Sequence, residues 1–190
     1  MYSDIIWKDA PMPESSPGTK LSTLFVNDTK DRSRLMIVEF PKNFSRPLTG
    51  HYPAYEELFI VEGTLAISGY NFKKNDYVLF PPNFTRSETE CVEGCLAIVW
   101  WSHKPSWSKG VSGDPNENII NKVDNNLESK FIEFLDNDEF YSFYLNNNDN
   151  VEKGPEGDFI GVDLESLSFV QGDDIKILDP SRYFLKQRSY

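Results

Sequence analysis

The stretch GHYPAYEELFIVEG, residues 50–63, decides the fold of this chain. It contains a run of aliphatic and aromatic residues that ends at Gly63. A second run, NDYVLFPPNFTRS at residues 75–87, is stopped by Pro81 and Pro82. Short β-rich segments bounded by Gly, Pro and Asn are typical of a sandwich or barrel. The sequence therefore predicts an all-β domain built around these two segments.

Further short strands are predicted at a spacing of roughly ten residues. The predicted segments are residues 34–40, 58–61, 64–68, 77–80 and 96–101. The Pro-, Ser- and Gly-rich stretch 105–115 then reads as a linker or surface crossover. We therefore expect a β-barrel domain over residues 1–105 and a C-terminal extension, or smaller second domain, over residues 106–190.

The C-terminal part carries a weaker pattern. Leu127, Phe131, Phe134 and Leu135 are spaced as on one face of a helix, which residues 140–145 would continue. The same aromatic residues also suit strands. Short strands are predicted at residues 159–164, 167–171 and 175–178, so the extension is expected to have mixed structure.

Charge is distributed unevenly along the chain. The formal net charge is −11, of which residues 1–110 carry −1 and residues 111–190 carry −10. A nucleic-acid partner would need clustered Lys and Arg, so none is expected. No apolar run is long enough to cross a bilayer, and the start of the chain lacks the pattern of a secretory signal. We expect a cytoplasmic protein in which Cys91 and Cys95 stay reduced.

Strand alternation groups the candidate site residues. Alternate residues of a strand point to the same face, so an uninterrupted strand would aim His51, Tyr55, Glu57 and Phe59 into the barrel. Pro53 removes a ladder donor, so the alternation is fixed only to within one residue. The aromatic residues beside both runs, Tyr77 and Trp100 among them, would supply the apolar part of a small-molecule pocket.

Residues 50–63 and 75–87 resemble the two signatures of the cupin superfamily, and EELFIVEG, residues 56–63, is closest to its ChrR-like branch. The segment 93–99 and Trp7 match that branch too. The resemblance implies a double-stranded β-helix, or jelly roll, over about residues 5–103. In that branch the barrel usually holds a divalent metal, zinc in anti-sigma factors and iron in diketone-cleaving dioxygenases.

The metal ligands of these signatures are incomplete here. By position, His51 and Glu57 match ligands of the family, whereas Pro53 and Arg86 stand where the family has histidines. Iron, zinc or manganese held by one imidazole and one carboxylate would be weak, because catalytic sites generally keep three protein ligands. We therefore interpret Arg86 as the positive centre of the barrel, paired with Glu57 or with an anionic ligand.

These residues support three functions. The first is a barrel that binds a small organic ligand through Arg86, Tyr55, Phe59, Tyr77 and Trp100 without turnover. The second is an enzyme, either dioxygenase-like with a weakly held metal, or a lyase or isomerase with His51 as general base and Glu57 orienting it. The third is a regulatory module whose acidic C-terminal part docks a protein. By analogy with other cupins we expect a homodimer.

Overall fold

The computed structural model of the chain describes residues 5–28, 32–113, 118–123, 131–136, 141–146, 157–174, 178 and 181–187. Contacts divide the chain into two compact units. The first, called the barrel unit, is Ile6–Val123, and the second combines Met1–Ile5 with Asp124–Tyr190. The boundary falls after Val123 rather than near residue 105, because strands beyond residue 105 pair with strands of the barrel unit.

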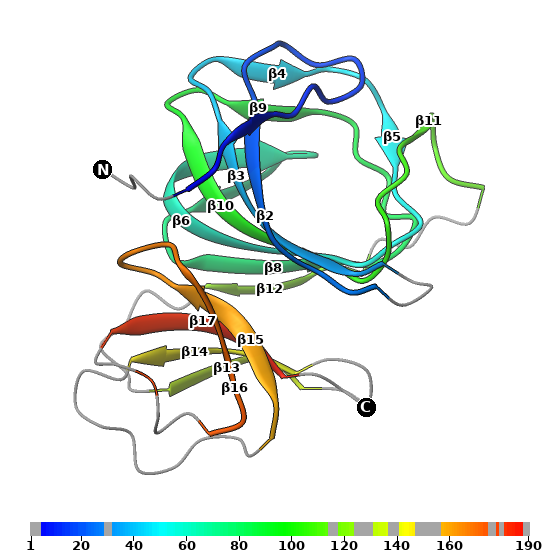
Figure 1. The fold of residues 1–190 in the computed structure, drawn as a ribbon. Coiled ribbons are helices and arrows are strands. Elements are labelled where there is room, and N and C mark those ends of the chain that lie inside the picture. Colours follow the sequence, from blue (N-terminus) through cyan, green and yellow to red (C-terminus); the bar gives the residue numbers. More distant parts are fainter. Residues whose placement is uncertain are drawn as a thin grey trace. The chain divides into compact units, whose positions relative to one another are not determined.

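The barrel unit is built from short antiparallel strands (Figure 1). They are β1 (Lys8–Asp9), β2 (Lys20–Val26), β3 (Arg34–Phe40), β4 (Phe44–Arg46), β5 (Gly50–His51), β6 (Glu56–Ile67), β7 (Tyr70–Lys73), β8 (Asp76–Phe80), β9 (Thr89–Cys91), β10 (Cys95–Trp101), β11 (Ser108–Lys109) and β12 (Ile120–Val123). The strands predicted at residues 34–40, 77–80 and 96–101 are confirmed. The two predicted at 58–61 and 64–68 are one continuous strand, β6.

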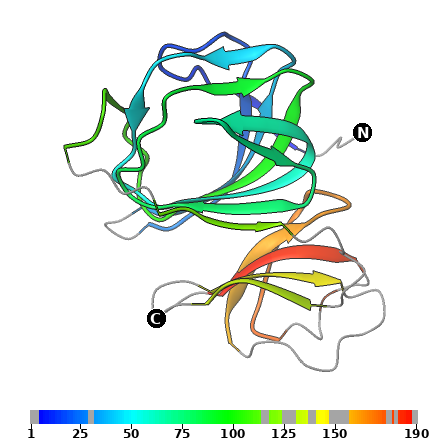
Figure 2. The same ribbon diagram turned by 180° about the vertical axis from the view of Figure 1, so that it is seen from behind.

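Strand β6 joins two sets of paired strands. One set runs in the order β1-β2-β3-β10-β6-β8-β12, while the far end of β6 pairs with β7 and β9, and β9 pairs with β4. Figures 1 and 2 show both sets curving around one interior, and β5 pairs with β11 at the rim. This is the all-β, jelly-roll type of barrel that the sequence predicts.

A β-bulge at Val61 lets β6 serve both sets. Leu96 pairs with Glu62 and Ala97 pairs with Ile60, so Val61 is the extra residue. A bulge of one residue reverses the alternation along a strand. Leu58 and Ile60 before the bulge, and Leu65 and Ile67 after it, therefore all face the same core.

The second unit is a five-stranded antiparallel sheet in the order β13-β14-β17-β15-β16. Its strands are β13 (Phe131–Asp136), β14 (Tyr141–Asn146), β15 (Phe159–Asp163), β16 (Phe169–Gly172) and β17 (Arg182–Gln187). A cluster of Phe143, Leu145, Phe159, Tyr183 and Leu185 forms its core.

The helix predicted within residues 127–145 is wrong. Residues 131–136 and 141–146 are strands paired with each other, and β14 also pairs with β17. Phe143 and Leu145 are both buried, as are Ser142 and Tyr144 between them. A strand buried on both faces shows no polar alternation that would separate it from a helix. The predicted strands at 159–164 and 167–171 are confirmed, whereas residues 175–177 lie outside the described residues.

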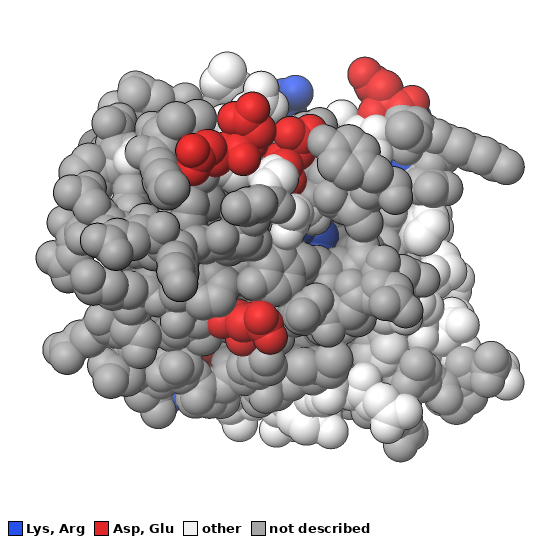
Figure 3. All heavy atoms as spheres, turned by 90° about the horizontal axis from the view of Figure 1, so that it is seen from below, with Lys and Arg blue, Asp and Glu red and all other residues white. Residues whose placement is uncertain are grey.

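The coloured surface in Figure 3 is more acidic than basic, with red Asp and Glu side chains covering more of it than blue Lys and Arg. This agrees with the net charge of −11. None of the described residues forms a helix long and apolar enough to span a membrane.

Candidate functional site

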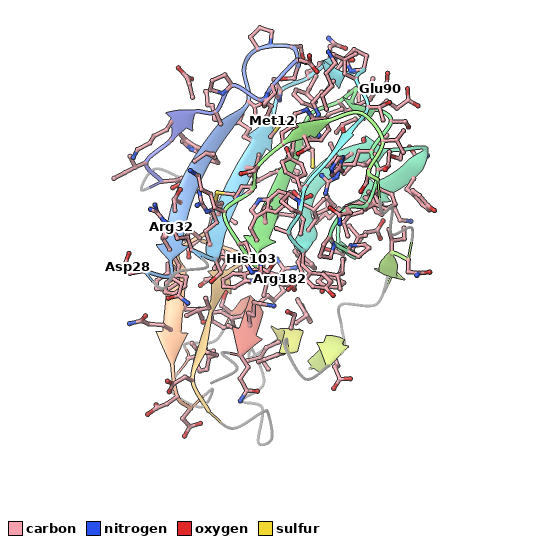
Figure 4. All side chains as sticks on the ribbon, turned by 90° about the vertical axis from the view of Figure 1, so that its right-hand side faces the viewer. Met12, Asp28, Arg32, Glu90, His103 and Arg182 are labelled. Carbon is pink, nitrogen blue, oxygen red and sulfur yellow. The ribbon has the colours of Figure 1, made fainter. Side chains whose placement is uncertain are left out.

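The barrel unit contains a partly open cavity of about 300 Å³ between its two sets of strands. Most of its wall is apolar and comes from β2, β3, β6 and β10. These residues are Leu21, Met36, Val38, Phe40, Leu58, Leu65, Ile67, Val99 and Trp101. Residues 10–13 also line the cavity, and Figure 4 labels Met12 on this N-terminal segment. An apolar cavity of this size suits a small organic molecule.

A buried ion pair lies in the wall of this cavity. Arg86 Nη2 donates a hydrogen bond to Glu56 Oε2, and each residue is only 5–6% exposed. The backbone N–H of Arg86 donates to the carbonyl of Gly50 at 2.8 Å, and the reverse bond measures 2.9 Å. The guanidinium also lies 4.7 Å from the ring centroid of Phe80. Backbone and aromatic contacts therefore hold the Arg86 charge in place.

A second arginine, Arg46, lies in the same wall and is 3% exposed. Its Nη1 donates to Tyr52 Oη at 3.1 Å, and its guanidinium carbon lies 3.9 Å from the ring centroid of Trp107. Within the described part of the chain, no carboxylate forms an ion pair with Arg46. The cavity therefore holds two guanidinium groups against one carboxylate, a surplus of one positive charge.

Several hydrogen-bonding atoms in the cavity wall are buried without a partner among the described residues. They are Arg46 Nε, Arg86 Nε, Thr89 Oγ1 and Trp107 Nε1. Arg46 and Thr89 are directly opposite each other in the β4–β9 pair. Buried donors are almost always satisfied in folded proteins, so a group of unpaired donors around one cavity indicates a site for an acceptor.

The electrostatics of Glu56 follow from its burial. Desolvation raises the pKa of this carboxyl above its ordinary value of 4.5, because a buried carboxylate loses its hydration. The positive charges of Arg86 and Arg46 act in the opposite direction and offset part of this effect. Glu56 is therefore the titratable group through which pH acts on the cavity.

The set of β6 residues predicted to point into the cavity is wrong by one position. Glu56 and Leu58 line the cavity, whereas Glu57 and Phe59 are buried on the opposite face of the strand. Arg86 accordingly pairs with Glu56 and not with Glu57. Glu57 Oε2 instead accepts a hydrogen bond from Tyr77 Oη at 3.0 Å.

The same shift moves the predicted aromatic ligand contacts out of the cavity. Tyr77 is opposite Phe59 in the β6–β8 pair, and Trp100 is opposite Glu57 in the β6–β10 pair, so both share the face of Glu57. Trp101 lines the cavity in place of Trp100. Tyr55 is half-buried, and its backbone N–H bonds Ser102 Oγ at 3.0 Å, outside the cavity lining.

The physical reason for the shift is that His51 and Glu57 do not share one strand. Strand β5 ends at His51, and the chain turns before β6 begins at Glu56. His51 Nδ1 lies 3.2 Å from the carbonyl oxygen of Gly110, and the residue is not part of the cavity lining. His103 is exposed, with Nδ1 2.8 Å from Ser102 Oγ, and Figure 4 shows it well away from Met12.

The side chains of the cavity do not fit a metal ion. Among the described residues there is no group of three His, Cys, Asp or Glu side chains that could hold one. The cavity itself offers a single carboxylate, Glu56, beside two arginines. Guanidinium groups have no lone pair to donate and repel cations.

Sequence comparison gives no assignment: no protein-family model and no curated protein matches the chain. Structural comparison does. A candidate dioxygenase from Nostoc punctiforme is 14% identical over 98% of this chain and 81% of its own, with a TM-score of 0.64. A candidate acetylacetone dioxygenase from Methylibium petroleiphilum is 19% identical over 63% of this chain and 85% of its own, with a TM-score of 0.50. The chain has the cupin fold.

The complex of SigE with the anti-sigma factor ChrR from Rhodobacter sphaeroides is also similar. It is 12% identical over 51% of this chain and 49% of the matched chain, at a TM-score of 0.41. At identities this low the likeness concerns the fold, and function has to be argued from the cavity itself.

Sequence reasoning identified Arg86 but missed Arg46, Tyr52, Glu56 and Trp107. No motif marks Arg46, which sits in a short strand before Pro47. For Glu56 the sequence does contain a signal, the spacing of the aliphatic residues in β6. Leu58, Ile60, Leu65 and Ile67 share one core face only if a bulge lies between Ile60 and Leu65, and that face includes Glu56.

Proposed function

We propose that the cavity of the barrel unit binds a small organic anion. The observation that carries this proposal is Arg46, a buried guanidinium that has no ion-pair partner among the described residues and faces a cavity. A buried charge is costly unless it is paired and hydrogen-bonded. The Trp107 ring and Tyr52 Oη offset part of that cost.

An anion would complete the hydrogen bonding of this wall. A carboxylate has two oxygens with about four lone-pair sites, and guanidinium groups bind it with favourable geometry. The unpaired Nε–H groups of Arg46 and Arg86, the Thr89 hydroxyl and the Trp107 indole N–H are donors for such oxygens. Glu56 already neutralises one arginine, so the charge of the cavity favours a ligand with one negative charge.

Binding without a metal is the function that these side chains support best. The dioxygenase names of the Nostoc and Methylibium proteins describe those proteins. In this chain the positions that face the cavity hold two arginines and one glutamate, which favours recognition of an anion over coordination of a cation.

Calorimetric titration tests the proposal. Octanoate, succinate and inorganic phosphate are titrated into wild-type protein and into Arg46→Met, whose unbranched side chain keeps contact with Trp107. At least one of these anions should bind wild type, and Arg46→Met should bind it at least about tenfold more weakly, because charged hydrogen bonds contribute about 1.5–3 kcal/mol.

Arg32→Met is the matched control. Arg32 is an exposed arginine of the same unit, on the loop between β2 and β3 (Figure 4), and its loss should leave binding unchanged. Near-ultraviolet circular dichroism checks that each variant is folded. If none of the three anions binds, or if folded Arg46→Met binds as tightly as wild type, the proposal is wrong.

A further inference from the structure

The polar and apolar side chains of the cavity come from different parts of the barrel unit. Arg46 and Thr89 lie on β4 and β9, Tyr52 and Trp107 lie on the segments beside β5 and β11, and Arg86 follows β8. Arg46 is connected to the others by the β4–β9 pairing, the Tyr52–Arg46 hydrogen bond and the Arg46–Trp107 contact. The Arg86 guanidinium joins them at 5.0 Å from the ring centroid of Tyr52. They form one polar group, which we call the arginine end.

Apart from Glu56, the rest of the wall is apolar. Met36, Val38 and Phe40 point inward from β3, and Val99 points inward from β10. Leu58, Leu65 and Ile67 complete this wall from β6. In this apolar wall there is no polar side chain to receive a second charged group, and burying an unpaired charge there would be costly.

We infer that the ligand is an amphipathic monocarboxylic acid, with its carboxylate at the arginine end and an aliphatic or aromatic body against the apolar wall. This inference rests on the proposed anion binding and names the chemical class of the ligand. The net charge of the arginine end and Glu56 matches a single carboxylate. The cavity of about 300 Å³ has room for such a body beside the carboxylate.

The inference distinguishes this class of ligand from two others. A dicarboxylate has to place its second charge against the apolar wall or beside Glu56. Inorganic phosphate satisfies the arginine end but leaves the apolar wall without a partner. A monocarboxylate instead gains affinity from each methylene that it buries, by about fourfold per group.

A chain-length series on the wild-type protein provides the test. Butanoate, hexanoate and octanoate are titrated by calorimetry at constant ionic strength, with succinate, inorganic phosphate and 1-octanol for comparison. We expect the dissociation constant to fall about fourfold per added methylene, until the acid outgrows the cavity. Hexanoate should bind at least about tenfold more tightly than succinate, and octanoate at least about tenfold more tightly than 1-octanol.

Each alternative result identifies what failed. If phosphate or succinate binds more tightly than hexanoate and Arg46→Met abolishes that binding, anion binding stands and the amphipathic ligand is excluded. If the affinity is the same from butanoate to octanoate, the apolar wall does not contact the ligand and the inference is wrong. If 1-octanol binds as tightly as octanoate, and Arg46→Met binds both as wild type does, both the inference and the proposed function are wrong.

Discussion

At the scale of single residues, the cavity depends on the buried pair of Arg86 and Glu56. Replacing Arg86 with Met leaves the Glu56 carboxyl buried without its partner, which should lower the free energy of unfolding by about 3–5 kcal/mol at pH 7. The double variant Arg86→Met/Glu56→Gln leaves no unpaired charge and should recover much of that loss. Urea denaturation of the single and double variants measures the coupling. Additive effects would show that the two side chains do not act as a pair.

The raised pKa of Glu56 determines how pH acts on stability. The native protein holds the Glu56 proton more tightly than the unfolded chain does. The stability that the protonated Glu56 carboxyl contributes to the folded protein is therefore fully present below pH 4.5 and is lost as pH rises through the folded-state pKa. Glu56→Gln has no proton to lose, so its stability relative to wild type should increase from pH 5 to pH 8. The other carboxyls are the same in both proteins, so their effects cancel when the unfolding free energy of wild type is subtracted from that of Glu56→Gln. If this difference stays constant or falls as pH rises, the assignment is wrong.

At the scale of elements, most of the strands could be predicted from the sequence, but their inner faces could not. Strands β8 and β10 are buried along their whole length, and so is the first half of β6. In such strands both faces are buried, so alternation does not say which one faces the cavity. This is why Glu57 and Trp100 were expected where Glu56 and Trp101 are found. The helix predicted to continue over residues 140–145 failed for the same reason, because Ser142, Phe143, Tyr144 and Leu145 of β14 are all buried.

The close approach of β6 to the turn before β10 gives a test at this scale. Gly63 has φ +80°, and a Cβ there would overlap the carbonyl oxygen of Gly94. Gly69 has φ +79° but no atom within 4 Å of its Cβ position, which makes it a matched control. Gly69→Ala should cost about 1–2 kcal/mol from the backbone conformation alone. Gly63→Ala should cost about 1–3 kcal/mol more through steric overlap, as measured by urea denaturation. Equal costs would mean that β6 and β10 do not pack as closely as described.

At the scale of the whole molecule, the match to the Nostoc protein extends over 98% of the chain and so includes both units. The fold alone would suggest a metal-containing barrel, whereas the cavity residues favour an anion. Protein produced in medium supplemented with iron, zinc and manganese should therefore carry well under one metal ion per chain by elemental analysis. About one ion per chain that is lost in Glu56→Gln would place a metal in the cavity and contradict this account.

The central claim is that an anion binds on the Glu56 face of the barrel, beside Arg46. The chain has four tryptophans, whose indole N–H signals can be followed by ¹⁵N NMR and assigned by Trp→Phe variants. Trp101 and Trp107 line the cavity, whereas Trp100 lies on the opposite face near Phe25, at a ring-centroid distance of 6.4 Å. During titration with octanoate, the signals of Trp101 and Trp107 should shift saturably, while those of Trp7 and Trp100 stay in place. If all four signals stay in place, or if Trp100 shifts and Trp107 does not, the account is wrong.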